Sequence, residues 1–143
     1  MTIRVKIRMD PGQRQHRFAR ILQTSDNKAH GTCLMVHESR VVGWIQTTSP
    51  SKTKVGDKHR KGRSPEVRSR EAIDDGKWHD VMLTYTGKTV ALYIDGRVRD
   101  QADWTGRLIN FDRINIGYVQ SNGFHYDGDM DEIQIYGRCL PPE

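Results

Sequence analysis

The sequence predicts an all-β, two-sheet antiparallel sandwich, and three observations support this fold class. Apolar and polar residues alternate with the two-residue period of a strand. Thirteen glycines and five prolines are spread along the 143 residues, which suits many short strands joined by turns. No stretch has the periodicity of an amphipathic helix, so we expect no helices.

The first third of the chain contains four expected strands. Residues 2–9 alternate between Ile3, Val5, Ile7 and Met9 on one face and basic residues on the other, which indicates a half-buried strand. Asp10-Pro11-Gly12 ends this strand. Further strands are expected at residues 20–23, 31–37 and 40–47, with a tight turn at Glu38-Ser39.

The middle of the chain is less regular. Residues 49–64 have turn residues and charges but little apolar periodicity, which predicts a long basic loop. Residues 66–72 are compatible with another strand, and Asp74-Asp75-Gly76 with a turn after it.

Residues 76–136 are the most informative part of the sequence. Residues 78–85 and 89–94 have the aromatic and β-branched content of strands, separated by a turn at Thr86-Gly87-Lys88. Asp95-Gly96 is a strong hairpin signal, because both central residues of a type I′ turn need positive φ. The pattern predicts two successive hairpins, then a strand at Ile114 to Gly117, a loop, and a closing strand.

Four motifs in this region occur in a characteristic order: W-H-x-V at Trp78, L-Y-I-D-G at Leu92, I-N-I-G at Ile114 and D-G-D-M-D-E-I-Q-I-Y-G at Asp127. This order resembles the C-terminal half of laminin-G-like modules of the concanavalin A-like lectin/glucanase superfamily. The resemblance covers residues 74–140 well and residues 1–73 loosely. It implies a jelly-roll sandwich.

The resemblance also sets expectations for domain organisation. We expect residues 1–143 to form a single laminin-G-like domain. Such modules usually carry a further strand ahead of the position of Thr2, and this sequence has none there. The first sheet would then be completed differently, for example by another subunit.

The termini and composition bear on location. No apolar run approaches the roughly 18 residues of a membrane span, and Met1 leads straight into a strand without a secretory leader. Either a leader has been removed or the protein does not use one. The resemblance implies an extracellular or cell-surface protein involved in adhesion, and a virion is the alternative.

Two cysteines are too few for a disulfide scaffold. Cys33 lies in an apparent strand, which favours a buried small hydrophobic residue, and Cys139 follows the last strand. A bridge between them stays open, since the sequence cannot fix their separation.

The net charge of +5 is concentrated in one region. Residues 49–70 hold eight basic and two acidic residues, whereas the rest of the chain holds 15 basic and 16 acidic residues. Such a loop would attract sulfated glycans or other anionic polymers, and the alternative is a solvated loop with no dedicated role. Nucleic acid fits less well, because no aromatic residue lies among the charges. The ligand-binding candidates in this loop are Lys58, Arg60, Lys61 and Arg63.

Catalysis is expected to be absent. Glucanases of this fold place carboxylates at alternate positions inside one strand, in a Glu-x-Asp-x-x-Glu pattern, to serve as nucleophile and general acid. Residues 127–132 have Asp127 where the first glutamate is expected, and they lie at the entrance of the strand. No histidine pair has metal-ligand spacing, so a zinc site is not expected.

Calcium is the expected cofactor. Asp127, Asp129 and Asp131 offer three carboxylates beside Gly128, and alternate residues of an extended segment share a face. In laminin-G-like modules an equivalent of Asp131 commonly helps to hold a structural calcium ion. The alternative is that Asp131 caps the turn and accepts a backbone hydrogen bond.

Carbohydrate recognition is expected from a second group of residues. Asn122 and His125 provide polar groups in a loop, and Trp104, in a polar stretch, is the candidate stacking platform, with packing at the rim of the core as its alternative. Trp44 and Trp78 lie in apolar strands and are expected in the core. The resemblance implies that an aromatic just before Asp127-Gly128, either Phe124 or Tyr126, is also buried.

These observations predict a non-catalytic module that binds carbohydrate or a glycosylated surface, with the basic loop favouring anionic glycans. The alternative is a structural module that decorates an assembly, such as a virion or cell-surface layer, and is completed by neighbouring subunits. A glycoside-active enzyme is third. The fold alone does not decide between these, because the superfamily hosts all three.

Overall fold

The computed structural model of the chain describes residues 1–12, 17–25, 31–48, 62–109, 111, 113–119 and 124–142. Within these residues every regular element is a strand and none is a helix that could cross a membrane. The strands are β1 Thr2–Arg8, β2 Ala19–Gln23, β3 Cys33–His37, β4 Arg40–Trp44, β5 Val67–Arg68, β6 Trp78–Tyr85, β7 Thr89–Ile94, β8 Arg97–Asp103, β9 Asn115–Ile116 and β10 Asp129–Tyr136.

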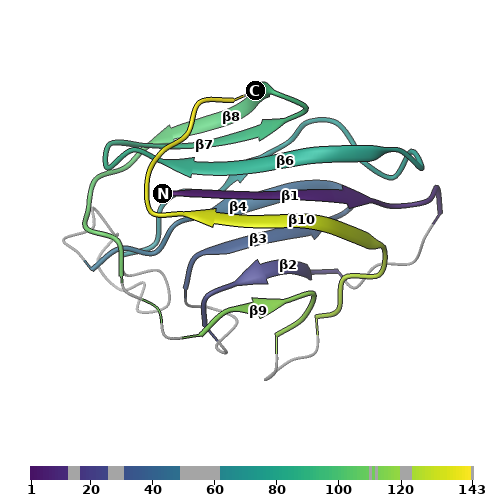
Figure 1. Cartoon of the computed structure of the whole chain (residues 1–143), viewed down its shortest axis with the longest axis horizontal. Coiled ribbons are helices and arrows are strands. Elements are labelled where there is room, and N and C mark those ends of the chain that lie inside the picture. Colours follow the sequence, from purple (N-terminus) through teal and green to yellow (C-terminus); the bar gives the residue numbers. More distant parts are fainter. Residues whose placement is uncertain are drawn as a thin grey trace.

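The strands form two five-stranded antiparallel sheets that pack face to face (Figure 1). The first sheet has the order β10-β1-β6-β7-β8 and the second the order β5-β4-β3-β2-β9. The predicted all-β jelly-roll sandwich is therefore confirmed. The N-terminus lies at one end of the first sheet, and the segment after β10 crosses the outer face of that sheet from this end (Figure 1).

The alternation in β1 determines the two faces of the first sheet. Ile3, Val5 and Ile7 are at most 1% exposed and point into the core, whereas the basic residues between them face outward. On the second sheet Leu34 and Val36 point into the same core. The apolar face of each sheet is thereby removed from water, which is the main contribution to the stability of a sandwich.

The predicted tight turns are confirmed by their backbone. Glu38 and Ser39 have φ values of 51° and 61°, and Asp95 and Gly96 have values of 53° and 77°. Positive φ at both central residues is the signature of the type I′ hairpin turn. These turns set the register of the β3–β4 and β7–β8 hairpins.

The strand expected at residues 66–72 is shorter than predicted, with only Val67 and Arg68 in β5. The flanking serines explain the difference. The hydroxyls of Ser64 and Ser69 accept hydrogen bonds from the backbone amides of Ile45 and Val41. Side-chain hydroxyls thus replace ladder bonds along this edge of β4.

A smaller cluster packs on the other face of the second sheet. Trp44 is 2% exposed and packs there with Cys33, Met35 and Val42, so the prediction that Trp44 is a core residue is confirmed. Cys33 is fully buried and Cys139 is exposed, and both are free thiols, so the open possibility of a bridge between them is not realised. Burial raises the pKa of Cys33 to about 12.

The prediction that Trp78 lies in the core is wrong, because 44% of this residue is exposed. Trp78 lies opposite Arg8 in the β1–β6 ladder. Residues opposite each other in an antiparallel pair share a face, and Arg8 faces outward, so Trp78 does too.

Candidate functional site

Three residues form a row across neighbouring strands on the outer face of the first sheet. Asp129 of β10 is opposite Arg8 of β1, and Arg8 is opposite Trp78 of β6. We call this row, Asp129, Arg8 and Trp78, the Trp78 surface. Its position on three paired strands fixes the backbone of all three residues, which is the arrangement that holds a binding site in place.

Arg8 links the other two members of the row. Its Nε and Nη2 donate to Asp129 Oδ2 at 2.9 and 2.7 Å, and its guanidinium carbon lies 5.1 Å from the centroid of the Trp78 ring. The cation–π contact orients the indole and covers part of one face. The Trp78 surface therefore presents an aromatic ring with a fixed donor and a fixed acceptor beside it.

His79 follows Trp78 and joins two turns at this end of the sheet. Its Nδ1 lies 2.8 Å from Asp95 Oδ2, and its Nε2 lies 3.0 Å from Asp75 Oδ1. Burial acts to lower the pKa of His79, but the hydrogen bonds to Asp95 and Asp75 outweigh it and raise this pKa. The pKa of the Asp75 carboxyl is lowered, first by the backbone amide of Lys77 and then by His79.

A second aromatic group lies at the same end of β1. His125 and Tyr118 stack with their ring centroids 6.2 Å apart and an interplanar angle of 18°, and both residues are exposed. The Tyr126 hydroxyl donates to the backbone oxygen of Arg8 at 3.1 Å, which anchors this segment to the end of β1. Tyr126 is 9% exposed, so the expectation of a buried aromatic just before Asp127-Gly128 is confirmed.

The three aspartates proposed as calcium ligands are placed at this end, but they do not converge. Asp129 is paired with Arg8, and Asp131 Oδ1 accepts the backbone amide of Glu132 at 2.8 Å, which is the capping role expected as the alternative. Within the described residues no three His, Cys, Asp or Glu side chains form a group that could hold a metal ion. The described geometry of Asp127, Asp129 and Asp131 does not fit a three-carboxylate site, and calcium stays a prediction from the sequence.

Trp104 lies at the opposite end of the sandwich from His125. Its backbone amide donates to Lys88 O at 2.9 Å, and its indole Nε1 donates to Thr47 Oγ1 at 3.2 Å. The ring is half-buried against the core. β1 spans seven residues between these two ends, or roughly 20 Å at a strand's rise. Trp104 and His125, which were expected to contribute to one site, are therefore not brought together.

Three of the four candidates in the basic loop lie outside the described residues: Lys58, Arg60 and Lys61. Asn122 lies outside them as well. Arg63 is described and is not a loose surface cation. Its guanidinium carbon lies 3.7 Å from the centroid of the Trp44 ring, and its Nη2 pairs with Glu66 at 2.6 Å. The position of Arg63 indicates a packing role on the second sheet.

Arg8 and Trp78 were not among the predicted binding residues. The sequence did indicate that Arg8 faces outward, but the face of Trp78 depends on the β1–β6 register. Register between strands 70 residues apart is set by tertiary packing, so no local pattern could supply it.

Comparisons with known proteins agree with this architecture. A family model described as the concanavalin A-like lectin/glucanases superfamily matches residues 1–143. A search of curated proteins gives no match for this chain.

Solved structures share the fold at low sequence identity. A proposed carbohydrate-binding protein from Bacteroides ovatus is similar over 99% of this chain, with a TM-score of 0.71 and 14% identity. The binding domain of Paraclostridial Mosquitocidal Protein 1 is similar over 99% of this chain, with a TM-score of 0.65 and 17% identity. Domains LG4-5 of the mouse laminin alpha1 chain are similar over 100% of this chain, with a TM-score of 0.60 and 15% identity. The chain spans 38%, 34% and 42% of those three proteins' chains, respectively.

Proposed function

The chain belongs to the concanavalin A-like lectin/glucanase superfamily, and from that premise we propose that it is a non-catalytic module that binds carbohydrate at the Trp78 surface. The observation that supports this proposal is the row formed by exposed Trp78, Arg8 and Asp129 on three paired strands. Sugars combine an apolar face of C–H groups with a rim of hydroxyls. An aromatic ring with charged groups fixed beside it complements both features.

Each member of the row has a separate role in this proposal. The open part of the Trp78 indole stacks on the sugar ring, Arg8 donates to hydroxyl oxygens, and Asp129 accepts from hydroxyl groups. Because Arg8 is already held by Asp129 and by the indole, little side-chain entropy is lost when sugar binds.

The carboxylates near the Trp78 surface support binding rather than hydrolysis. A glycosidase needs two carboxyl groups that face each other across the scissile bond, one as general acid. Asp129 and Glu132 instead point toward the cations of β1, where Arg8 and Lys6 pair with them at 2.7 and 2.8 Å. Hydrogen bonding to Glu132 also raises the pKa of Lys6.

We also propose that anionic glycans, such as the sulfated chains of an extracellular or cell-surface matrix, are the preferred ligands. The positive charges of Lys58, Arg60 and Lys61, which are known from the sequence, would attract such ligands. Arg8 adds a positive charge on the Trp78 surface itself. The test is salt-dependent elution from a heparin column. In a triple variant, Lys58, Arg60 and Lys61 are replaced by neutral residues. If this variant elutes at the same salt concentration as the wild type, the proposed preference for anionic glycans is refuted, and neutral sugars remain as ligands.

A glycan array with three proteins tests the central proposal. The wild type is expected to bind a defined group of glycans, Trp78→Ala to lose that binding, and Val98→Ala to retain it. Val98 is 52% exposed on β8 of the same sheet, so it controls for the loss of an exposed apolar side chain away from the Trp78 surface. Binding that survives in Trp78→Ala, or a wild type that binds no glycan, would refute carbohydrate recognition at this surface.

A further inference from the structure

The edge of the sandwich formed by β10 and β9 leaves core-facing apolar side chains exposed. Ile135 of β10 is opposite Ile3 of β1, so both point toward the core, yet Ile3 is 1% exposed and Ile135 is 37% exposed. Ile133 lies on the same face by strand alternation and is also 37% exposed. The core face of β10 is thus incompletely covered.

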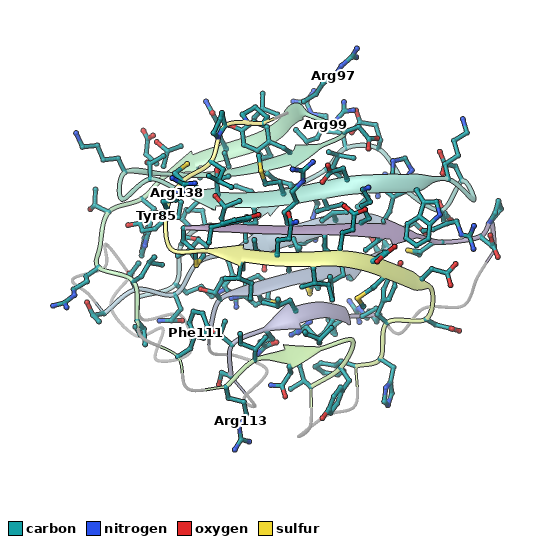
Figure 2. The ribbon with its side chains drawn as sticks, viewed as in Figure 1. Tyr85, Arg97, Arg99, Phe111, Arg113 and Arg138 are labelled. Carbon is teal, nitrogen blue, oxygen red and sulfur yellow. The ribbon has the colours of Figure 1, made fainter. Side chains whose placement is uncertain are left out.

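The second sheet shows the same feature at the facing edge. Ile116 of β9 is opposite Leu22, which is 1% exposed, but Ile116 itself is 44% exposed. Ile114, two residues earlier, is 41% exposed, and Phe111 lies beside the segment that leads into β9 (Figure 2). Apolar side chains of both sheets therefore border one lateral opening, which we call the β10–β9 opening.

The two strands close on each other at one end of this opening. A Cβ at Gly117 would lie 3.7 Å from Met130 Cε, and the Tyr126 amide donates to Gly117 O at 2.8 Å. From there β10 runs on toward Ile135, and the other strand runs back toward Ile114. The exposed isoleucines of the two strands therefore lie on the same side of the closed end.

The opposite edge of the sandwich is closed by contrast. There the backbone amide of Arg68 on β5 donates to Asp100 of β8 at 2.9 Å, and Arg99 of β8 pairs with Glu71 at 2.8 Å. Polar links thus join the two sheets at that edge, and the strands β5 and β8 are in contact. Among the described residues, no such polar link joins β10 to β9, and exposed isoleucines border the β10–β9 opening instead.

The backbone of β10 determines what kind of group can cover the opening. β10 has eight residues and ends the sheet order, with β1 as its partner in the described structure. The outer backbone groups of an edge strand are satisfied by another extended backbone. The bulge at Glu132, whose φ is 51°, fixes the register of an added strand, because a ladder cannot slide past a bulge.

Charge selects the sequence of the added strand. Asp129, Asp131 and Glu132 make the outer face of β10 acidic, and β1 complements it with Lys6 and Arg8. A second copy of β10 that overlaps this one along its acidic half would bring these carboxylates together, which is unfavourable. The complementary strand carries basic residues outward and apolar residues inward.

We propose that the β10 edge is a docking site for an extended segment of a partner protein in which apolar residues alternate with Lys or Arg. The segment adds a strand to the first sheet, its apolar residues cover the β10–β9 opening, and its basic residues pair with the free side of the β10 carboxylates. β1 itself has this alternation on the other side of β10, so the molecule already contains one example of the complementary strand.

The proposal is tested with a fluorescent peptide that has the sequence of residues 2–9, the natural complement of β10. Anisotropy is expected to show binding, and amide exchange of β10 is expected to slow when the peptide is present. A peptide with Glu at the three basic positions is expected to bind more weakly by about tenfold, equivalent to about 1.4 kcal/mol.

Two variants of the protein locate the site. Ile135→Arg and, as a milder change that suits a strand, Ile133→Thr are expected to weaken peptide binding, whereas Val98→Arg on the closed edge is expected to leave it unchanged. Thermal melts of all three establish that they are folded. Undetectable peptide binding, equal binding to Ile133→Thr and wild type, or dimerisation of the protein through β10 would each overturn the proposal.

Discussion

The two ends of β1 differ in how their aromatic residues are held. At the Met1 end, the Tyr85 amide donates to Met1 O at 2.9 Å, the Tyr85 hydroxyl to Gly106 O at 2.6 Å, and Trp104 to Thr47. At the Arg8 end, Trp78 has a guanidinium over its ring, while His79 bridges two surface carboxylates. Figure 2 shows Tyr85 beside the strand end where the chain begins.

This difference distinguishes aromatic residues that stabilise the fold from exposed ones of the same chemical type. An aromatic side chain whose polar atom is hydrogen-bonded to the rest of the protein stabilises the fold. Exposing it would break that hydrogen bond, and water would have to solvate both partners again. An aromatic ring that is exposed and held only by a surface cation is available to a ligand. Substitutions at Tyr85, Trp104, His79 and Trp78 test this contrast, from the largest expected effect to the smallest.

The largest effect is expected for Tyr85→Ala at the Met1 end. Tyr85 is 3% exposed within the core, and burial raises its hydroxyl pKa. The substitution should lower the free energy of unfolding by about 3–5 kcal/mol, the range for deleting a large buried aromatic. Urea unfolding measures this change. Tyr85→Phe, which keeps the ring and removes the bond to Gly106, should cost roughly 1 kcal/mol.

Trp104→Ala is expected to have an intermediate effect. The ring is half-buried, and its Nε1 bond to Thr47 is lost with it. Gly106 approaches Thr47 so closely that a Cβ there would lie 2.6 Å from Thr47 Oγ1, so this corner has little room to rearrange. The free energy of unfolding should fall by roughly 1–3 kcal/mol. A change of less than about 0.5 kcal/mol would place Trp104 with the exposed surface residues.

The sequence was sufficient for features that depend on neighbouring residues. The alternation in β1, the turns at Glu38-Ser39 and Asp95-Gly96, and the burial of Trp44 were all predicted and confirmed. These features depend on local periodicity and on the φ values that a turn requires.

The sequence was insufficient for features that depend on register between distant strands. The outward face of Trp78 follows from its pairing with Arg8, and the ion pair of Arg8 follows from its pairing with Asp129, 121 residues away. Trp104 and His125 are likewise separated because they lie at opposite ends of β1. Long-range pairing is selected by the packing of the whole core, which no short motif encodes.

His79→Gln tests the polar links of the Arg8 end. The folded pKa of His79 is raised above its unfolded value, so the imidazolium contributes stability that is full below the unfolded pKa of about 6.5 and is lost as the pH rises through the folded pKa. The melting temperature of His79→Gln should therefore lie below that of wild type in acid, and the difference should shrink toward alkaline pH.

A control that removes no titratable group is Val98→Ala, at an exposed position on β8 of the same sheet. Its melting temperature should follow the wild-type pH profile, because neither valine nor alanine titrates. A difference between His79→Gln and wild type that stays constant with pH would show that His79 contributes by packing rather than by its charge.

The smallest effect on stability is expected for Trp78→Ala, which makes the same chemical change as Trp104→Ala at the other end of β1. Trp78 is 44% exposed, and its specific contact is with the Arg8 guanidinium, which keeps its ion pair to Asp129 when the indole is removed. The free energy of unfolding should therefore change by no more than about 0.5 kcal/mol, as at other surface positions. Urea unfolding of the two tryptophan variants side by side measures the contrast directly. If Trp78→Ala destabilises the protein as much as Trp104→Ala does, Trp78 is part of the packed structure, and the Arg8 end is no more available to a ligand than the Met1 end. If Trp78→Ala is as stable as wild type, the ring is retained at the surface without a role in the fold, as a binding residue requires.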